Sequence, residues 1–443
     1  MIAAIQTFLS TQVWPQTLSW LWFLAPIWVP LICLELAWNL WVRYVRYVRF
    51  LGQKSVVLEI KLPQETVKSP AAMELVLNSL LQTGGESTDS DMFWKGSTRP
   101  WTSLELAVIN GEIHFYIWCF EGQKNSISSA IYSQYPDVVV NEVEDYTKVV
   151  FEHRDIYDVW ACQFLLTKKV HAYPIKTYID YGLSDDPDEE FKVDPLTALI
   201  ESLGTTSKDD QIWFQFIARA HIDEKLGFGR KAESPWIKDA RKEIQEIIDS
   251  ASTERIEVTE SGKIKKIMTP VTAKMTSEKK DLIDSLSRSI AKFPFDVGIR
   301  AIQAYPKGET GHIRRDIIKG AFRQFGSNNL NNLKPNDQDY SHMWEDPAYY
   351  FPSLRKFMTP RNKRLGEHLF RCYCMRSYFY YPYVPGPHMP LMSWGIRYKN
   401  IPNQIINTEG LATLYHFPGS TAKAPALHRI PSKRADAPTN LPI

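Results

Sequence analysis

The dipeptide Asn110-Gly111 lies between two runs of alternating apolar residues, and this pattern constrains the fold more than any other feature. Leu104, Leu106 and Val108 precede it, and Ile113, Phe115, Ile117 and Cys119 follow it. Alternation places the apolar side chains of a strand on one face. Asn and Gly both tolerate the positive φ angles of a two-residue hairpin turn. The sequence therefore predicts an antiparallel hairpin here.

Helix and strand signals surround this hairpin symmetrically. A strand over 56–62 and a helix over 69–84 precede it, and a helix over 125–135 and a strand over 138–143 follow it. Ser69 and Pro70 form a cap-then-proline start for the first helix. The order β-α-β-β-α-β is that of the ferredoxin-like split unit. We predict a ferredoxin-like domain over residues 55–150.

A second, looser copy of this pattern occupies residues 156–325. It consists of a strand over 159–167, a helix between Asp194-Pro195 and Gly204 and a strand around Ile212–Phe216, and a helix over 277–292 and a strand over 295–305 complete it. A helix over 313–325 follows. Residues 221–275 are an insertion, with a charged helix from Pro235 to Ser250 and a hairpin around Ser261-Gly262. The expected fold class is α+β, with two tandem ferredoxin-like domains.

The C-terminal third has few clear periods. Residues 326–418 form an irregular region rich in aromatics and proline, which begins with a loop from Asn328 to Pro335. Residues 419–443 are Pro-rich and basic, which is the composition of a linker or arm.

The first fifty residues read as a membrane anchor. Leu18 to Leu34 carries no charge and is about long enough to cross a hydrocarbon core as a tilted or kinked helix. Six of the fourteen tryptophans lie in or beside this run, and indole rings favour the headgroup level. Pro26 and Pro30 should kink the helix. A signal peptide fits poorly because its charges should precede the apolar run; a buried core helix or an interfacial helix is the alternative.

Arg43, Arg46 and Arg49 follow the apolar run, whereas no Lys or Arg precedes it. Positive flanks stay in the cytoplasm. We therefore expect a single pass through the inner (cytoplasmic) membrane, with the bulk of the chain in the cytoplasm. Five scattered cysteines agree with a reducing compartment.

No catalytic or cofactor motif is found. The sequence lacks a phosphate-binding loop, a dinucleotide fingerprint, a nucleophile elbow and a metalloprotease motif. His368, Cys372, Cys374 and His388 could hold zinc, but C-x-C is not a usual structural spacing, so buried structural cysteines are favoured. The acidic run from Asp185 to Glu190 reads as a solvated loop. We expect no enzyme activity, no cofactor and no metal.

Two groups of residues could contact nucleic acid. The helix over 313–325 has a positive face that could touch phosphates together with Arg361, Lys363 and Arg364, although an ordinary exposed face is favoured. That face consists of Arg314, Arg315, Lys319 and Arg323. His114, Tyr116 and Trp118 lie opposite the apolar face of their strand and could stack on bases. The net charge of +2 argues against extensive binding of this kind.

Four stretches carry a resemblance to a known family. They are Ser69-Pro-Ala-Ala-Met-Glu74, Ile131-Tyr-Ser-Gln-Tyr-Pro136 into Val143-Glu-Asp-Tyr146, Tyr173-Pro-Ile-Lys-Thr-Tyr178, and Asn407-Thr-Glu-Gly-Leu-Ala-Thr-Leu-Tyr-His-Phe-Pro418. Together they resemble the N-terminal, non-motor region of membrane-anchored type IV secretion or conjugation ATPases of the FtsK/HerA kind, as found in candidate-phyla bacteria. The resemblance covers nearly the whole chain.

In that family a P-loop motor follows a short Pro-rich linker, but this sequence stops where the motor should start. The resemblance therefore implies a scaffold or accessory subunit that docks a separate FtsK/HerA-type ATPase, or a fragment of a longer one. Membrane lipid, self-association and indirect contact with nucleic acid are the other expected partners. A membrane-tethered nucleic-acid-binding module is the alternative function.

The tail should dock on the folded body through Leu411, Leu414 and Phe417, at i, i+3 and i+6 of a short helix capped by Thr408. Residues from Gly419 onward should be mobile, because such an arm buries little apolar surface.

Overall fold

The structure is a computed structural model, and it describes residues 14–64, 68–86, 88–168, 170–183, 194–222, 234–251, 253–258, 264–269, 275–308, 312–337, 366–379, 404–419 and 426–430. The chain divides into two compact units. The first consists of Met1–Gln53 and Gly84–Thr98, and the second of Lys54–Thr83 and Arg99–Ile443.

The first unit is built on one long helix, α2 (Trp14–Leu51), which continues through Pro26 and Pro30. Its 38 residues extend about 57 Å at ~1.5 Å per residue. Its apolar side chains are exposed, including Trp22 and Phe23. Among the described residues, α2 alone is long and apolar enough to cross a membrane, a test that a signal sequence near an N-terminus also passes. A short helix, α4 (Asp89–Phe93), completes this unit.

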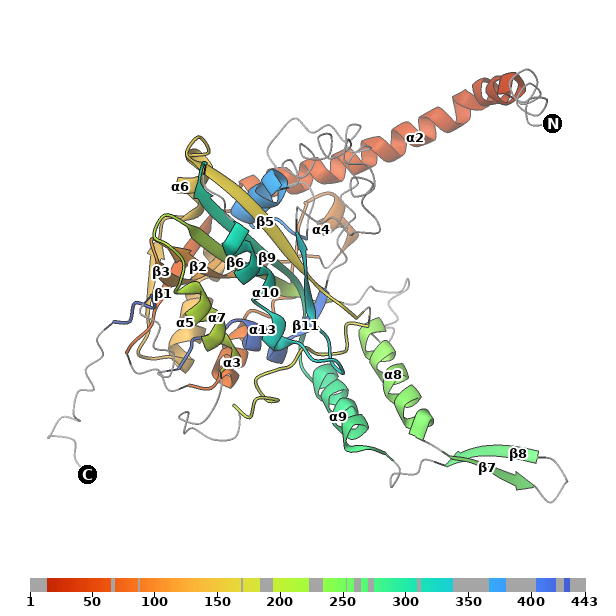
Figure 1. Ribbon diagram of the computed structural model, residues 1–443. Helices are drawn as coiled ribbons and strands as arrows, with labels where there is room; N and C mark the ends of the chain where they lie inside the picture. The colour runs from red at the N-terminus through yellow and green to blue at the C-terminus, as the bar shows by residue number, and fades with distance from the viewer. Residues whose placement is uncertain are drawn as a thin grey trace, which may run out of the picture. The chain divides into compact units, whose positions relative to one another are not determined.

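The second unit is built on an antiparallel sheet of nine strands (Figure 1). The strands are β1 (Ser55–Lys61), β2 (Trp101–Ile109), β3 (Glu112–Phe120), β4 (Val139–Val143), β5 (Tyr157–Leu166), β6 (Gln211–Ala220), β9 (Pro294–Pro306), β10 (Leu333–Asp337) and β11 (Gln404–Asn407). Their order across the sheet is β10-β5-β9-β6-β2-β3-β1-β4, and β11 pairs with β9.

The first half of the sheet follows the sequence expectation closely. Its strands lie in the order β2-β3-β1-β4, with α3 (Pro70–Ser79) after β1 and α5 (Lys124–Gln134) after β3. The Ser69 side chain caps α3 by accepting from the Ala71 N–H. The predicted hairpin is confirmed, since Asn110 and Gly111 have φ angles of 54° and 79° between paired β2 and β3. A further short helix, α6 (Thr147–Glu152), leads into β5.

The second half has the order β10-β5-β9-β6, with α7 (Pro195–Leu203) after β5 and α10 (His312–Gly320) after β9. The sequence pattern predicts that this half is complete at the strand over 295–305 and that a loop lies over 328–335. That loop prediction is wrong, because β10 lies there and pairs with β5. β10 is an edge strand containing Pro335, and only Leu333 gives it an apolar signal, so periodicity could not reveal it.

The insertion between β6 and β9 contains α8 (Pro235–Ala251), the paired strands β7 (Thr253–Val258) and β8 (Ile264–Thr269), and α9 (Ser277–Ala291). β7 and β8 confirm the predicted hairpin, although its turn lies outside the described residues. α8 and α9 share a small apolar cluster around Trp236, Ala240 and Leu286. The helix expected to complete the second ferredoxin-like domain therefore packs with the insertion.

The two halves form one sheet because β2 pairs with β6 from Trp101↔Arg219 to Val108↔Ile212. On one face, the alternating apolar residues of both halves pack under the helices in a single core. Figure 1 shows α3, α5, α7, α10 and α13 (Thr408–Leu414) gathered on this side. Residues of both predicted domains thus contribute to one hydrophobic core.

The last described segments, 404–419 and 426–430, form a C-terminal strap. β11 pairs with β9 in the second half, whereas α13 packs against α3 in the first half. Farther on, Ile430 forms a bridge with Pro63, next to the end of β1. The strap therefore joins the two halves of the sheet a second time.

Candidate functional site: a buried ion network and the C-terminal strap

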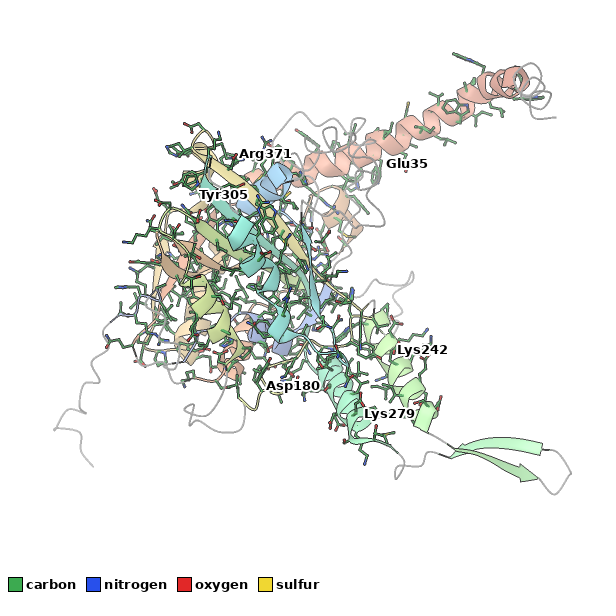
Figure 2. All side chains as sticks on the ribbon, in the orientation of Figure 1. Glu35, Asp180, Lys242, Lys279, Tyr305 and Arg371 are labelled. Atoms are coloured by element: carbon green, nitrogen blue, oxygen red, sulfur yellow. The ribbon has the colours of Figure 1, made fainter. Side chains whose placement is uncertain are left out.

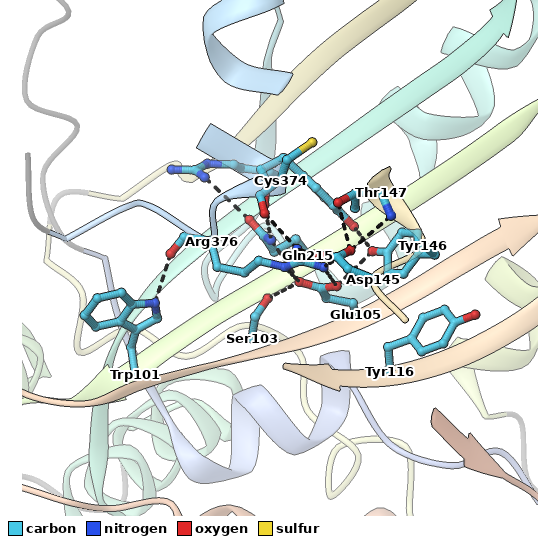
Figure 3. A network of polar contacts seen from close by, with 12 residues as sticks. Trp101, Ser103, Glu105, Tyr116, Asp145, Tyr146, Thr147, Gln215, Cys374 and Arg376 are labelled. Atoms are coloured by element: carbon cyan, nitrogen blue, oxygen red, sulfur yellow. Dashed lines mark hydrogen bonds and ion pairs between the residues drawn. The ribbon is translucent and has the colours of Figure 1, made fainter. Parts of the chain in front are cut away.

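The sheet face opposite the helices carries polar side chains, and residues 366–379, the cover segment, lie on it. Arg376 of this segment is 1% exposed. Its guanidinium contacts both carboxylate oxygens of Glu105, at 2.9 Å from Nε to Oε1 and 3.0 Å from Nη2 to Oε2. On its other side it donates to Asp145, with 3.1 Å between Nη2 and Oδ1 (Figure 3). One buried cation is thus shared by two carboxylates.

Neutral groups complete the network around Glu105 (Figure 3). Its carboxylate accepts from Ser103 Oγ at 2.6 Å, from Gln215 Nε2 at 3.0 Å and from the Tyr146 hydroxyl at 2.8 Å. The Trp101 indole donates to the Arg376 carbonyl at 2.9 Å. These bonds close the site and fix the cover segment to the sheet.

The protonation states follow from this closure. Burial disfavours the charged form of Arg376, but Glu105 and Asp145 outweigh it and raise the pKa of Arg376 well above its usual value. Burial likewise opposes ionisation of Asp145, whose pKa is nevertheless lowered by Arg376 and Thr147. Arg376 and Asp145 therefore both favour their charged forms, and their ion pair links the cover segment to the chain after β4.

The expectation that Tyr116 and Trp118 are exposed is wrong. Tyr116 is 5% exposed and stacks on Tyr146, with 4.7 Å between ring centroids. Trp118 is 4% exposed and stacks on Trp101. His114 is half-buried and paired with Glu59 at 2.8 Å. The face that could have received bases is already covered by the chain's own aromatic residues.

The basic helix also differs from its expected role. Arg315 and Lys319 each lie 5.6 Å from the centre of the Trp160 ring, within cation–π range. Arg323 follows α10 and is exposed. Arg314 belongs to α10, but its side chain lies outside the described residues, as do Arg361, Lys363 and Arg364. Two of the four predicted cations are thus engaged with the sheet.

The cover segment contains two free cysteines, Cys372 and Cys374. Cys372 Sγ lies 3.4 Å from His368 Nε2, one helical turn away. Burial raises the pKa of Cys372 and raises that of Cys374 to about 12, so both thiols keep their protons. In the described ranges, no group of three or more His, Cys, Asp or Glu residues could hold a metal ion. His388 and the acidic run 185–190 lie outside those ranges.

The expected anchors of the tail are buried. Leu411, Leu414 and Phe417 are each at most 1% exposed. The Phe417 ring lies 5.6 Å from Phe115 and 4.9 Å from Tyr135. The predicted helix register is wrong, however, because α13 ends at Leu414 and Phe417 lies beyond its C-cap, Tyr415.

The predicted cap of that helix is also wrong. Asn407 is the N-cap, and its side chain accepts from the Gly410 N–H at 2.8 Å. Thr408 instead donates to Glu74 at 3.1 Å. Both residue types suit a cap. The β11 strand includes Asn407, which leaves this residue at the strand-to-helix junction.

His416 fastens the strap to the second half of the sheet. Its Nε2 lies 3.1 Å from Asp194 Oδ2, and its Nδ1 lies 3.0 Å from the Ala412 carbonyl. Burial opposes the imidazolium, but Asp194 and the backbone carbonyls raise the pKa of His416. Burial also opposes the charge on Asp194, whose pKa is lowered by His416 and by the N-terminal amides of α7. This is a buried ion pair between strap and helix cap.

Part of the chain beyond Gly419 is folded, contrary to expectation. Ala426 and Leu427 are buried, and the Ala426 carbonyl accepts from the Ile113 N–H at 2.8 Å. Arg429 donates to the Pro63 and Gly419 carbonyls. Residues 426–430 therefore belong to the folded body, although 420–425 and 431–443 lie outside the described residues.

Arg46 and Arg49, two of the three arginines that flank the apolar run, lie in the last turns of α2. Arg43 is also in α2, but its side chain is outside the described residues.

Comparison of the sequence with protein-family models finds no match, and comparison with curated proteins finds none either.

Proposed function

We propose that this protein is a membrane-anchored accessory or scaffold subunit of a type IV secretion or conjugation-like translocation machine. It would hold a separate P-loop ATPase of the FtsK/HerA type at the inner membrane. The observation that carries the proposal is α2, an exposed apolar helix long enough to span a bilayer, joined to a much larger folded body. The sequence resemblance supplies the class of machine.

The body supports a scaffold role through its internal chemistry. Glu105, Asp145 and Arg376 hold the cover segment, and Asp194 and His416 hold the strap. Ion pairs used in this way fix chain segments on the body and so define its surface. In this proposal the two halves are tandem ferredoxin-like units joined through β2 and β6, and the protein has no catalytic role of its own.

Orientation is the first test of the anchor. We propose that the body lies in the cytoplasm, with Arg43, Arg46 and Arg49 at the inner boundary. Reporter fusions after residue 60 should then be active only in the cytoplasm. Replacing the three arginines by Glu should weaken or invert this orientation, since each arginine near an anionic leaflet contributes about 1 kcal/mol of attraction. Periplasmic activity of the unmodified fusion would reverse the proposed topology.

Partner recovery tests the machine. Affinity purification of the tagged full chain from detergent-solubilised membranes should recover an ATPase of the FtsK/HerA type. A matched sample carrying Leu411→Ala reports whether the strap is needed for that contact. Recovery of unrelated soluble enzymes alone would refute the scaffold proposal.

A membrane-tethered nucleic-acid-binding module is the second candidate, and the burial of Tyr116 and Trp118 disfavours it. Phosphate contacts would make binding fall steeply with added salt. Titration of single-stranded DNA at two salt concentrations distinguishes the candidates, because the scaffold proposal requires no direct binding.

A further inference from the structure

The first unit contains an aromatic cluster in which one indole remains largely exposed. Phe93 and Trp94, at the end of α4, pack on Trp38 and Trp41 of α2, with 5.5 Å between the Trp38 and Phe93 ring centroids and 5.7 Å between those of Trp41 and Trp94. The Trp41 indole also donates to the Phe93 carbonyl at 3.1 Å. Trp94 nevertheless remains 63% exposed, although it contacts the rings of both Trp38 and Trp41.

The position of this cluster along α2 is specific. Trp22 and Trp41 are 19 residues apart in one helix, which is about 28 Å at ~1.5 Å per residue. A bilayer's hydrocarbon core is about 30 Å thick. Tryptophans therefore bracket a segment of membrane-spanning length, in which Glu35 is the one charged residue (Figure 2). Trp38 and Trp41 mark the end of the span that precedes Arg46 and Arg49.

Local contacts fix the short helix α4 beside Trp38 and Trp41. Thr88 caps α4 by accepting from the Asp91 N–H, and Asp91 pairs with Lys95 at 2.8 Å. Gly96 has a φ of +62°, and a Cβ there would lie 2.6 Å from the Val45 carbonyl oxygen. The backbone after Trp94 can approach α2 this closely only because residue 96 is glycine. This close approach keeps Trp94 beside Trp41 along the axis of α2.

We propose that residues 88–96 form a second membrane contact, in which Trp94 enters the lipid headgroup layer beside the span. This inference rests on the proposed membrane anchoring by α2. An exposed indole at the end of a membrane-length apolar segment suits the interface. The neighbouring Lys95, whose side chain is 65% exposed, suits anionic headgroups. Lipid is the expected occupant because the patch is continuous with the spanning helix itself.

The test uses the full chain in vesicles of phosphatidylcholine and phosphatidylglycerol. A Trp94→Cys variant, in a Cys33→Ala background, carries an environment-sensitive fluorophore, and a lipid with a nitroxide at the headgroup serves as quencher. We expect at least about a twofold loss of fluorescence at position 94. The same label at the exposed Glu201 position, introduced by Glu201→Cys, should lose little. Lys95→Cys provides a second site should the Trp94 variant fail to fold.

Native Cys33, which lies between Trp22 and Trp41 in α2, separates failure of this inference from failure of the anchor. If α2 spans the bilayer, Cys33 of the unmodified chain resists an aqueous maleimide until detergent is added. Protected Cys33 with no quenching at 94 or 95 would overturn the loop contact alone. Reactive Cys33 in intact vesicles would overturn the spanning helix, and with it the inference, whether or not position 94 is quenched.

Discussion

At the residue scale, the informative positions are charged groups where a core would be expected to be apolar. Glu105 lies between Leu104 and Leu106 in β2 and is fully buried. A buried ion pair adds little stability relative to an apolar replacement of both partners. Removal of one partner is strongly destabilising, because the other charge stays buried without compensation. The Glu105–Arg376–Asp145 cluster should therefore be sensitive to single substitutions, and its main effect is to fix one position for the cover segment.

Replacing Arg376 by Met should lower the free energy of unfolding by about 3–5 kcal/mol, because Glu105 loses its bidentate partner inside the protein. Arg371 is the matched control, since it lies in the helix that ends just before Arg376 but is exposed (Figure 2). Arg371→Met should change stability by no more than about 0.5 kcal/mol. Denaturant titration of both variants measures the difference, and equal small losses would show that the cluster is not tightly coupled.

The His416–Asp194 pair predicts a defined pH dependence. The raised pKa of His416 adds stability that is complete below its unfolded value near 6.5 and is lost as pH rises through the folded value. The lowered pKa of Asp194 adds stability that is complete above its unfolded value near 3.8 and is lost as pH falls through the folded value. The free energy of unfolding of the wild type should therefore exceed that of His416→Gln by most between the two unfolded pKa values, near 3.8 and near 6.5.

Unfolding free energies of the wild type and His416→Gln at pH 5, 6 and 8.5 would measure this. We expect the gap between the two proteins to narrow at pH 8.5. A gap independent of pH would mean that His416 acts only by packing.

At the element scale, the strap is a structural part of the core. Leu411 in α13 is completely buried, and the helix packs on α3. Leu411→Ala should cost about 2–5 kcal/mol, the range for buried leucines whose cavity cannot fully close. Leu75 lies on α3 but is 55% exposed, so Leu75→Ala should cost about 0.5 kcal/mol or less. Similar losses in the two variants would indicate that α13 docks only loosely.

The sequence was informative at this scale wherever the signal was local. Asn110-Gly111 identified the hairpin, and the caps Ser69 and Asp194 marked helix starts within one residue of those observed. It failed where structure depends on distant partners. β10 is a strand because β5 offers it an edge, and Tyr116 is buried because Tyr146 covers it. Glu105 could have been noticed as a lone carboxylate in an apolar strand, but its partner Arg376 is 271 residues away.

At the scale of the whole molecule, the two halves of the sheet should unfold together. The β2–β6 pairing, the shared core and the strap all connect them. In native-state hydrogen exchange, amides in β3 and β9 should therefore report the same opening free energy. Leu411→Ala should lower both values equally. Separate values for β3 and β9, with only one affected by the substitution, would instead describe two independent domains.

The strap also fixes when the protein can finish folding during its synthesis. Thr408 bonds to Glu74, which the ribosome makes 334 residues earlier. At ~5–20 residues per second this delay is roughly 17–67 s. Throughout that interval, the apolar side of α3 that receives Leu411 has no cover from α13. The nascent chain thus exposes part of its apolar core surface while it is still being translated. We expect chaperones that act at the ribosome to bind this surface.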